Sequence, residues 1–199
     1  MIERLETERL ILRQWRDSDR RSFRELNSDP RVMEFMPTLL TPEASDEMMD
    51  RIQKGFLLHD FGLFAAELRM DQSFLGFIGL SVPGYDAPFM PAVEIGWRIA
   101  ARHWGCGLAT EGAREVLRFA FESAGLDSVV SFTVPGNIRS RRVMEKLGMT
   151  HDSADDFDHP RLPVGHALQH HVLYRLHRRD WKSFQTQKSR SKERLFPPA

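Results

Sequence analysis

The sequence predicts a single mixed α/β (α+β) domain whose sheet is mostly antiparallel and carries helices on both faces. Two observations lead to this fold class. Short apolar runs that suit strands alternate along the chain with longer runs in which apolar residues recur at helical spacing. The strand-like residues 61–68 and 74–82 are also joined by the turn sequence Met70-Asp71-Gln72-Ser73, which predicts an antiparallel hairpin. The length of 199 residues is enough for one domain with a sizeable core.

Composition narrows the class of protein. The chain has 28 Lys+Arg and 28 Asp+Glu residues, so its formal charge is zero and we expect no nucleic-acid partner. No apolar run approaches the roughly 18 residues that a membrane helix needs, and residues 1–6 lack the apolar segment of a signal peptide. Cys106 is the single cysteine, which excludes an internal disulfide. These features predict a cytoplasmic protein with no membrane partner.

The first 60 residues are expected to form one strand and three helical segments. Leu10–Arg13 has the alternation of a strand. Asp17 or Asp19 can cap the helix that follows it. Asp29-Pro30 and Thr41-Pro42 each predict a helix start, because proline is tolerated at the first helical position.

The second half of the chain alternates strands and helices. Residues 92–99 and 128–134 suit strands, whereas residues 110–123 and 138–147 have helical spacing, with Gly148 placed to end the second helix. A final strand pair is expected at residues 149–156 and 169–177. Residues 182–199 are polar and basic, and we expect them to form a C-terminal tail.

Two long loops are candidates for substrate recognition. Residues 83–90 and 157–168 contain turn-forming Pro and Gly residues, and loops of this length are often functional. The segment 152–171 is rich in His and Asp, but it lacks a helical His-x-x-x-His spacing with a third ligand. We therefore expect no metal there, and the alternatives are recognition of the acceptor or a solvated loop.

A glycine-containing turn joins the strand at residues 92–99 to the next helix. Its sequence, Arg102-His103-Trp104-Gly105-Cys106-Gly107-Leu108-Ala109-Thr110, points several backbone N–H groups at one place beside a helix N-terminus, which suits a phosphate or pyrophosphate. It is not a Walker A loop, because no Gly-Lys-Ser/Thr follows. It is not a Rossmann fingerprint either, because Thr110 stands where the third glycine would be. An ordinary tight turn is the alternative.

A second motif, residues 132–149, has the sequence FTVPGNIRSRRVMEKLGM. Together the two motifs resemble the GNAT superfamily of acyl-CoA-dependent N-acetyltransferases, in which an Arg-x-x-Gly-x-Gly loop holds the pyrophosphate and Asn-x-x-Ser opens a later helix. The start of the chain, Glu6-Thr7-Glu8-Arg9-Leu10-Ile11-Leu12-Arg13, is similar to the RimJ/RimL-like branch, which includes ribosomal-protein N-acetyltransferases. The resemblance covers residues 5–181. It implies a six- or seven-stranded sheet in which the strands near Val93 and Phe132 splay apart to admit the cofactor.

The resemblance also implies roles for particular side chains. Glu94 is the candidate general base, with a structural or substrate-binding carboxylate as the alternative. Many enzymes that this chain resembles place a tyrosine near the leaving sulfur, whereas the RimJ/RimL branch uses a serine. Because the chain has only Tyr85 and Tyr174 as tyrosines, the resemblance implies that Ser140 donates a hydrogen bond to the leaving sulfur. Asn137 would bond to the pantetheine amide or, alternatively, cap the helix that follows it.

The cofactor expected is acetyl-CoA, which acts as a co-substrate, and no metal is expected. Backbone groups on the strand at residues 92–99 would pair with the pantetheine, the loop amides would hold the pyrophosphate, and Cys106 would be a small loop residue rather than a nucleophile. The residues expected to bind the cofactor are Ile95, Trp97, Arg102, Trp104, Gly105, Cys106, Gly107, Leu108, Ala109, Thr110, Asn137 and Arg142.

The function implied is transfer of an acetyl group from acetyl-CoA to a primary amine by direct attack, without a covalent enzyme intermediate. The amine could belong to a protein N-terminus or to a small molecule. Two alternatives stay open: a domain that binds or senses acyl-CoA without turnover, and an N-acyltransferase that uses another acyl-CoA. The sheet edges and C-terminal strands also leave a homodimer open.

Overall fold

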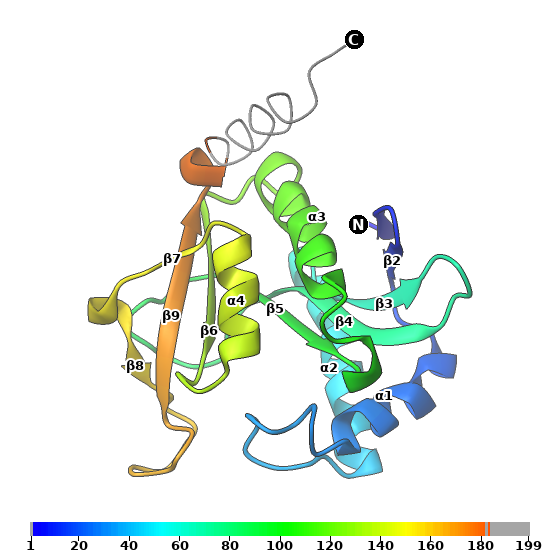
Figure 1. The fold of residues 1–199 in the computed structure, drawn as a ribbon, viewed down its shortest axis with the longest axis horizontal. Coiled ribbons are helices and arrows are strands. Elements are labelled where there is room, and N and C mark those ends of the chain that lie inside the picture. Colours follow the sequence, from blue (N-terminus) through cyan, green and yellow to red (C-terminus); the bar gives the residue numbers. More distant parts are fainter. Residues whose placement is uncertain (1, 182, 184–199) are drawn as a thin grey trace.

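The computed structural model describes residues 2–181 and 183 (Figure 1). The strands are β1 (Arg4–Glu6), β2 (Leu10–Arg13), β3 (Leu63–Leu68), β4 (Phe74–Ser81), β5 (Glu94–Ile99), β6 (Ser128–Thr133), β7 (Thr150–His151), β8 (Phe157–Asp158) and β9 (His170–His177). The helices are α1 (Arg20–Ser28), α2 (Pro42–His59), α3 (Leu108–Glu122) and α4 (Ile138–Lys146). Each of these helices and each of the longer strands overlaps a segment that the sequence predicts to adopt the same conformation.

The strands form one mixed sheet in the order β1-β2-β3-β4-β5-β6-β9-β7, with β8 paired to β9. The described residues thus give nine strands, whereas the family resemblance implies six or seven. The additional members β1, β7 and β8 are only two or three residues long, which is too short to show the alternation that identifies a strand. All neighbours in this sheet are antiparallel except β5 and β6, which are parallel.

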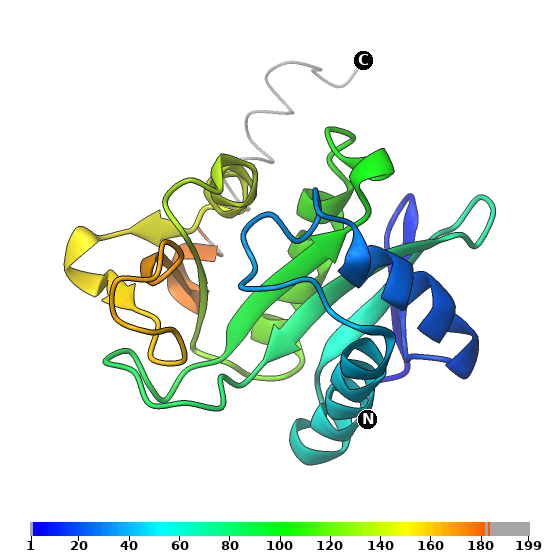
Figure 2. The same cartoon turned by 90° about the horizontal axis from the view of Figure 1, so that it is seen from below.

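Helices cover both faces of the sheet, as predicted. In two perpendicular views α3 and α4 lie on one face and α1 and α2 on the other (Figures 1 and 2). The core between these layers is apolar, and its largest fully buried side chains include Phe23, Phe56, Phe64 and Leu117. Gly112 brings α3 close to the sheet, because a Cβ at this position would overlap the side chain of Ile78.

The two strands that carry the expected cofactor site diverge. β5 and β6 have a single matched pair, Glu94 with Val130, and the strands separate beyond it (Figure 1). β6 continues instead as the antiparallel partner of β9 over Ser128–Thr133. This confirms the splayed arrangement near Val93 and Phe132 that the family resemblance implies.

Three local expectations were wrong. Residues 30–36 form turns instead of a helix after Asp29. Asp19 stands at the N-cap position of α1, but its carboxylate makes no cap hydrogen bond there and accepts instead from Arg13 and from the Arg16 N–H. The strand expected at residues 149–156 is reduced to β7, because the Asp152 side chain accepts from the Ala154 N–H and starts a 3₁₀ turn over Ser153–Asp155. The expected tail, apart from Ser183, lies outside the described residues.

A buried charged network joins β2 to β3. The Arg13 guanidinium donates to both carboxylate oxygens of Asp19 at 2.7 and 2.9 Å and to Glu67 Oε2 at 2.6 Å. All three side chains are buried. Because each charge has an opposite partner within hydrogen-bond distance, this arginine serves the fold rather than a ligand.

Candidate active site

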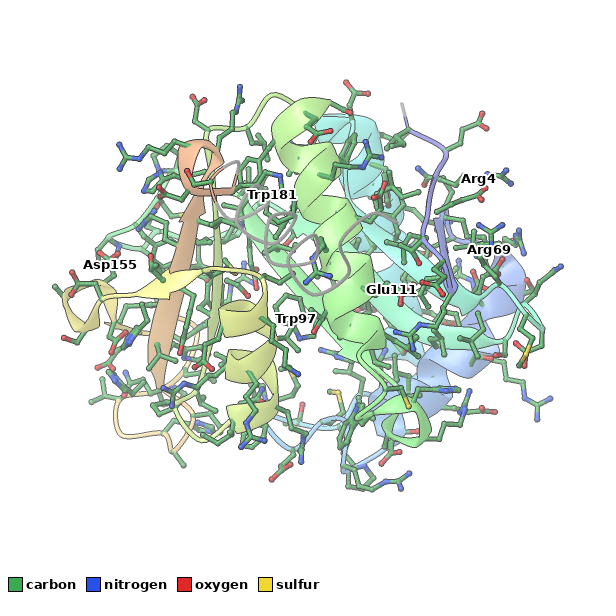
Figure 3. The ribbon with its side chains drawn as sticks, turned by 45° about the horizontal axis from the view of Figure 1, so that its top comes forward. Arg4, Arg69, Trp97, Glu111, Asp155 and Trp181 are labelled. Atoms are coloured by element: carbon green, nitrogen blue, oxygen red, sulfur yellow. The ribbon has the colours of Figure 1, made fainter. Side chains whose placement is uncertain are left out.

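A cavity of about 310 Å³ opens beside the end of β5, between this strand and α4. Its walls are the end of β5, the turn before α3 with the first residues of α3, one face of α4 and the segment between α1 and α2. Trp97 marks its place, since the side chain lies between α3 and α4 (Figure 3). The lining residues are Arg31, Val32, Phe35, Met36, Trp97, Arg98, Ile99, His103, Trp104, Gly105, Gly107, Leu108, Ala109, Thr110, Asn137, Arg139, Ser140, Arg142, Val143 and Lys146.

The glycine turn presents backbone N–H groups to this cavity. Gly105 and Gly107 both have a φ of 77°, a left-handed conformation that glycine adopts without strain. Gly107 occupies the N-cap position of α3, where no side chain caps the helix. The first N–H groups of α3, whose residues Leu108, Ala109 and Thr110 line the cavity, are therefore available to an anion.

Hydrogen bonds to the strand on each side hold this turn in place. The Trp104 indole N–H donates to Ile99 O at 2.7 Å. Arg9, the residue before β2, donates to Cys106 O at 3.0 Å and pairs with Glu111 on α3. These bonds fix both ends of the turn before any ligand arrives, which favours binding because less ordering is needed.

The cavity is strongly cationic. Its lining residues contain no Asp or Glu, and Arg139, Arg142 and Lys146 line it from α4. Arg31 also lines it but is paired with Asp29 at 2.7 Å, and Arg98 approaches it from β5. Arg139 pairs with Glu34 outside the lining and stacks over the Trp104 ring at 4.3 Å. A cavity lined by one sign of charge attracts a ligand of the opposite sign, so the site suits a polyanion such as a phosphorylated cofactor.

The edge of β5 is open where it borders the cavity. Ala100 N–H donates to Leu75 O at 2.8 Å, and bonded and unbonded residues alternate along an antiparallel pair. The peptide of Trp97 therefore faces away from β4 and toward β6. Since β6 is matched to β5 only at Glu94, the N–H and C=O of Trp97 are left to an extended ligand.

Glu94 begins β5 and is half-buried. Burial raises the pKa of its carboxyl to about 7, partly opposed by a hydrogen bond of 3.4 Å from the Ser81 hydroxyl. A carboxylate with a pKa near neutrality can accept a proton and release it again under cellular conditions. Glu94 thus has the acid–base property expected of a general base.

Asn137 and Ser140 lie at the start of α4, on the cavity wall. The Asn137 side chain accepts from the Ser140 N–H at 3.2 Å and donates to Thr133 Oγ1 at 3.0 Å, so it caps the helix as the alternative interpretation stated. Ser140 is half-buried and is one of the residues that line the cavity.

Residues 9–150, the greater part of the chain, match the family model described as an acetyltransferase (GNAT) domain. The chain belongs to the GNAT acetyltransferase family. Both motifs that suggested this family lie within the matched residues. As a member of the family, the protein is an N-acetyltransferase.

Two curated proteins are similar to this chain in sequence. The FsC-acetyl coenzyme A-N(2)-transacetylase of Aspergillus fumigatus is 39% identical over 106 residues, which are 52% of this chain and 43% of that protein. The match thus spans less than half of that enzyme. The uncharacterized protein YkkB of Bacillus subtilis is 34% identical over 147 residues, 73% of this chain and 84% of that protein.

A solved structure shows the same fold. The ribosomal-protein-S5-alanine acetyltransferase from Vibrio fischeri superposes with a TM-score of 0.70 at 17% identity, covering 90% of this chain and 99% of that one. At this identity the likeness shows the shared GNAT fold, within which RimJ/RimL-like proteins are neighbours of this chain.

Most residues predicted for the GNAT site meet at the cavity, and four do not line it. Arg102 points away, because its guanidinium donates to Phe74 O at 3.1 Å and to the His103 ring at 2.9 Å. Cys106 is exposed on the outer side of the turn, and Ile95 is buried in the core. Glu94, the first residue of β5, does not line the cavity, which borders the other end of this strand.

Sequence reasoning missed several cavity residues. Arg139 and Lys146 could have been found, because they share one face of α4 with Arg142 at i, i+3 and i+7. The segment from Arg31 to Met36 could not, because its position depends on packing between distant parts of the chain. Arg98 gives no local signal, because in the sequence it is one polar residue among the alternating polar and apolar residues of β5.

The two long loops that we expected to shape the acceptor side contact each other. The Tyr85 ring lies 4.7 Å from that of His159, and Arg161 donates to Gly84 O at 2.6 Å. The Tyr85 hydroxyl is buried and has no hydrogen-bond partner among residues 2–181 and 183. Burial and the nearby charge of Glu94 raise its pKa, so the phenol stays protonated near Glu94.

The His- and Asp-rich segment packs as part of an aromatic cluster. The His171 ring lies 5.1 Å from His159 and 5.9 Å from Phe132. Burial lowers the pKa of both histidines, so both rings are neutral at pH 7. Within the part of the chain that the structure describes, no group of three His, Cys, Asp or Glu side chains could hold a metal ion. The same residues include no helix long and apolar enough to cross a membrane.

Proposed function

We propose that this N-acetyltransferase uses acetyl-CoA and transfers the acetyl group to a primary amine by direct attack. One observation carries the proposal: a cavity without acidic lining residues has free helix N–H groups at one end and an open strand edge along its side. Coenzyme A has the matching chemistry, since charged phosphates end in an extended arm that contains amides. The printed name of the Aspergillus relative, an acetyl coenzyme A transacetylase, agrees with this choice.

The phosphates and the arm are assigned to different residues. The N–H groups of residues 107–110 take the pyrophosphate, and Arg142 and Lys146 on the exposed side of α4 add charge to the rim. The backbone of Trp97 pairs with the arm, and Asn137 borders it from α4. Arg102 is replaced in this role by the α4 cations, because it points away from the cavity.

The chemical step needs a base and a donor. Glu94, directly or through a water molecule, accepts the proton as the amine nitrogen bonds to the thioester carbonyl carbon. The C–S bond then breaks, the carbonyl re-forms, and the Ser140 hydroxyl donates a hydrogen bond to the departing thiolate. Both side chains lie on segments that face the splay between β5 and β6.

The test is thermal unfolding with and without saturating acetyl-CoA. Ligand at about 100 times its dissociation constant adds roughly 2.7 kcal/mol, which raises Tm by about 5–10 °C for a domain of this size. Arg142→Glu should reduce the shift. The matched variant Arg21→Glu, an exposed arginine on α1, should keep it.

Release of free coenzyme A over a panel of primary amines then measures turnover. A Tm shift followed by acetyl transfer supports the proposal. A shift without turnover on any amine would instead favour a domain that binds acyl-CoA only, and a larger shift with longer acyl chains would favour another acyl donor. No shift with acetyl-CoA or coenzyme A would overturn the assignment of the cavity.

A further inference from the structure

Arg98 is a charged side chain that the proposed chemistry does not use. It lies on β5 and lines the cavity beneath the segment that connects α1 to α2. It is half-buried, and burial lowers its pKa to about 10, so it remains cationic at neutral pH. Removing a cation from water costs free energy unless hydrogen bonds or an opposite charge replace its hydration.

The compensation available within the protein is weak. Arg98 Nη1 donates to Asn27 Oδ1 at 2.5 Å, and its remaining contacts are with the sulfur atoms of Met36 at 3.3 Å and Met48 at 4.0 Å. The guanidinium also lies 5.3 Å from the Phe77 ring. Among residues 2–181 and 183, no carboxylate pairs with it. These neutral partners fix the side chain but leave its charge unmatched and several N–H donors unused.

Asn27 is itself held so that its oxygen faces Arg98. Its amide nitrogen donates to Ser45 Oγ at 2.8 Å, and both Asn27 and Ser45 are fully buried. The guanidinium is thus held from two helices, α1 and α2, and placed at the cavity wall. A fixed, unpaired guanidinium at a cavity is arranged to bind an anion from outside the protein.

The face of β5 indicates which anion. Side chains alternate along a strand, so Arg98 and Glu94 share one face, and Trp97 lies on the other. Phe77, the cross-strand neighbour of Arg98, packs on Phe23 of α1, so this is the face that carries α1 and α2. The α3 amides and α4 cations that we assign to the cofactor phosphates lie on the opposite face. Arg98 therefore belongs with Glu94, on the acceptor side.

We propose that Arg98 binds an anionic oxygen group of the acceptor, a carboxylate or a phosphate, while the amine of the same molecule reacts beside Glu94. The two residues are four positions apart on β5, which corresponds to about 13 Å of strand, so the acceptor is elongated. This inference rests on the proposed transfer to an amine and names the class of acceptor: a primary amine that carries an acidic group at a distance.

The test compares matched acceptors with the wild type and two variants. The acceptors are dipeptides with a free C-terminal carboxylate, the same dipeptides as C-terminal amides, and aminoalkyl phosphates of similar length. We expect the wild type to prefer one of the two anionic sets over the amides by about tenfold or more in kcat/KM, because one charge-assisted contact is worth roughly that much. The preferred set then distinguishes carboxylate from phosphate.

In Arg98→Met the preference should fall to about one, because the flexible apolar side chain suits the methionine and phenylalanine surroundings but carries no charge. Arg98→Lys should keep part of the preference, since it retains the charge but loses the planar fork. The Kd for acetyl-CoA should stay within about twofold of the wild type in both. A wild type that prefers neither anionic set, or a preference that survives in Arg98→Met, would overturn the inference. Loss of acetyl-CoA affinity in Arg98→Met with the preference intact would reassign Arg98 to the cofactor.

A second measurement keeps this inference separate from the proposed turnover. The protein saturated with coenzyme A is titrated with the dipeptide acids, the dipeptide amides and the aminoalkyl phosphates, and Tm is recorded. If the anionic molecules raise Tm in the wild type but not in Arg98→Met, the anion site stands even where no amine is acetylated. If none of the three sets raises Tm and none is acetylated, the inference fails, whatever the result with acetyl-CoA alone.

Discussion

Arg13 and Arg98 are both withdrawn from solvent on the same sheet, yet their surroundings are opposite. Arg13 on β2 donates to two carboxylates, Asp19 and Glu67. Burial lowers its pKa, but the hydrogen bonds and charges of these partners raise it by more. Around Arg98 on β5 burial acts alone, and the pKa falls to about 10.

The difference separates a charge that stabilises the fold from a charge that is available to a ligand. A buried ion pair is retained where both partners are fixed, because removing one leaves the other uncompensated. An unpaired guanidinium lowers the stability of the free protein, and only a bound anion offsets this loss. The buried arginine on β2 is thus neutralised by carboxylates within the protein, whereas the arginine on β5 can still bind an anion in the cavity.

Stability should separate the two arginines most strongly. Arg13→Met leaves the buried carboxylates of Asp19 and Glu67 without a positively charged partner, so the free energy of unfolding should fall by about 3–5 kcal/mol. Arg98→Met removes a charge that has no acidic partner but leaves the buried Asn27 Oδ1 without its donor, so the loss should be about 1–3 kcal/mol, smaller than for Arg13→Met. Urea denaturation of both variants at pH 7 measures this. Equal losses would mean that Arg98 is as much a part of the fold as Arg13.

The same comparison extends to the carboxylates on these strands. Glu67 on β3 is paired with Arg13, whereas Glu94 on β5 has only the Ser81 hydroxyl and a pKa of about 7. If Glu94 is the base, kcat/KM should rise as the pH increases through about 7. Glu94→Gln should lower the rate by about 10²-fold and abolish that part of the profile. A rise of the same size in Glu94→Gln would belong to the amine itself and would remove Glu94 from the mechanism.

Stability gives a second readout for Glu94. Its pKa is raised in the folded protein, so its contribution to stability is fully present below pH 4.5 and is lost as the pH rises through about 7. Glu94→Gln should therefore gain stability relative to the wild type between pH 5 and pH 8. Glu67→Gln, the matched control, should instead lose stability because it weakens the pairing with Arg13, and it should keep the pH profile of the rate.

Much of the fold could be predicted because local patterns and tertiary packing agree. The helix that begins after Thr41 has the predicted proline in its first turn, and the structure adds a Thr41 hydroxyl that accepts from Ala44 N–H. The glycine turn likewise needs only local conformations, and Gly105 and Gly107 supply them. Where a segment depends on distant partners, as residues 30–36 do, the local helix signal of Asp29-Pro30 misleads.

The candidate site also has parts that the sequence predicts and parts that it does not. Its glycine turn and its α4 face are encoded locally, so the sequence identified Gly107, Asn137 and Ser140. The direction of a long side chain is set by neighbours remote in sequence. Arg102 turns to the Phe74 carbonyl and Arg98 turns to Asn27, 71 residues away. No spacing rule within one strand or turn contains that information.

Two serines give the smallest of the expected contrasts. Ser45 is fully buried, and its hydroxyl accepts from the Asn27 amide, whereas Ser140 borders the cavity at the start of α4. Ser45→Ala leaves a buried N–H without a partner, so the free energy of unfolding should fall by about 1–3 kcal/mol while kcat at saturating acceptor stays within about twofold. Ser140→Ala should leave unfolding nearly unchanged and lower kcat roughly tenfold with little effect on the Kd for acetyl-CoA, because its hydrogen bond matters only as the thiolate departs. Wild-type kcat in Ser140→Ala would show that the leaving sulfur needs no hydroxyl at this position, and the role of α4 would then be limited to holding the cofactor.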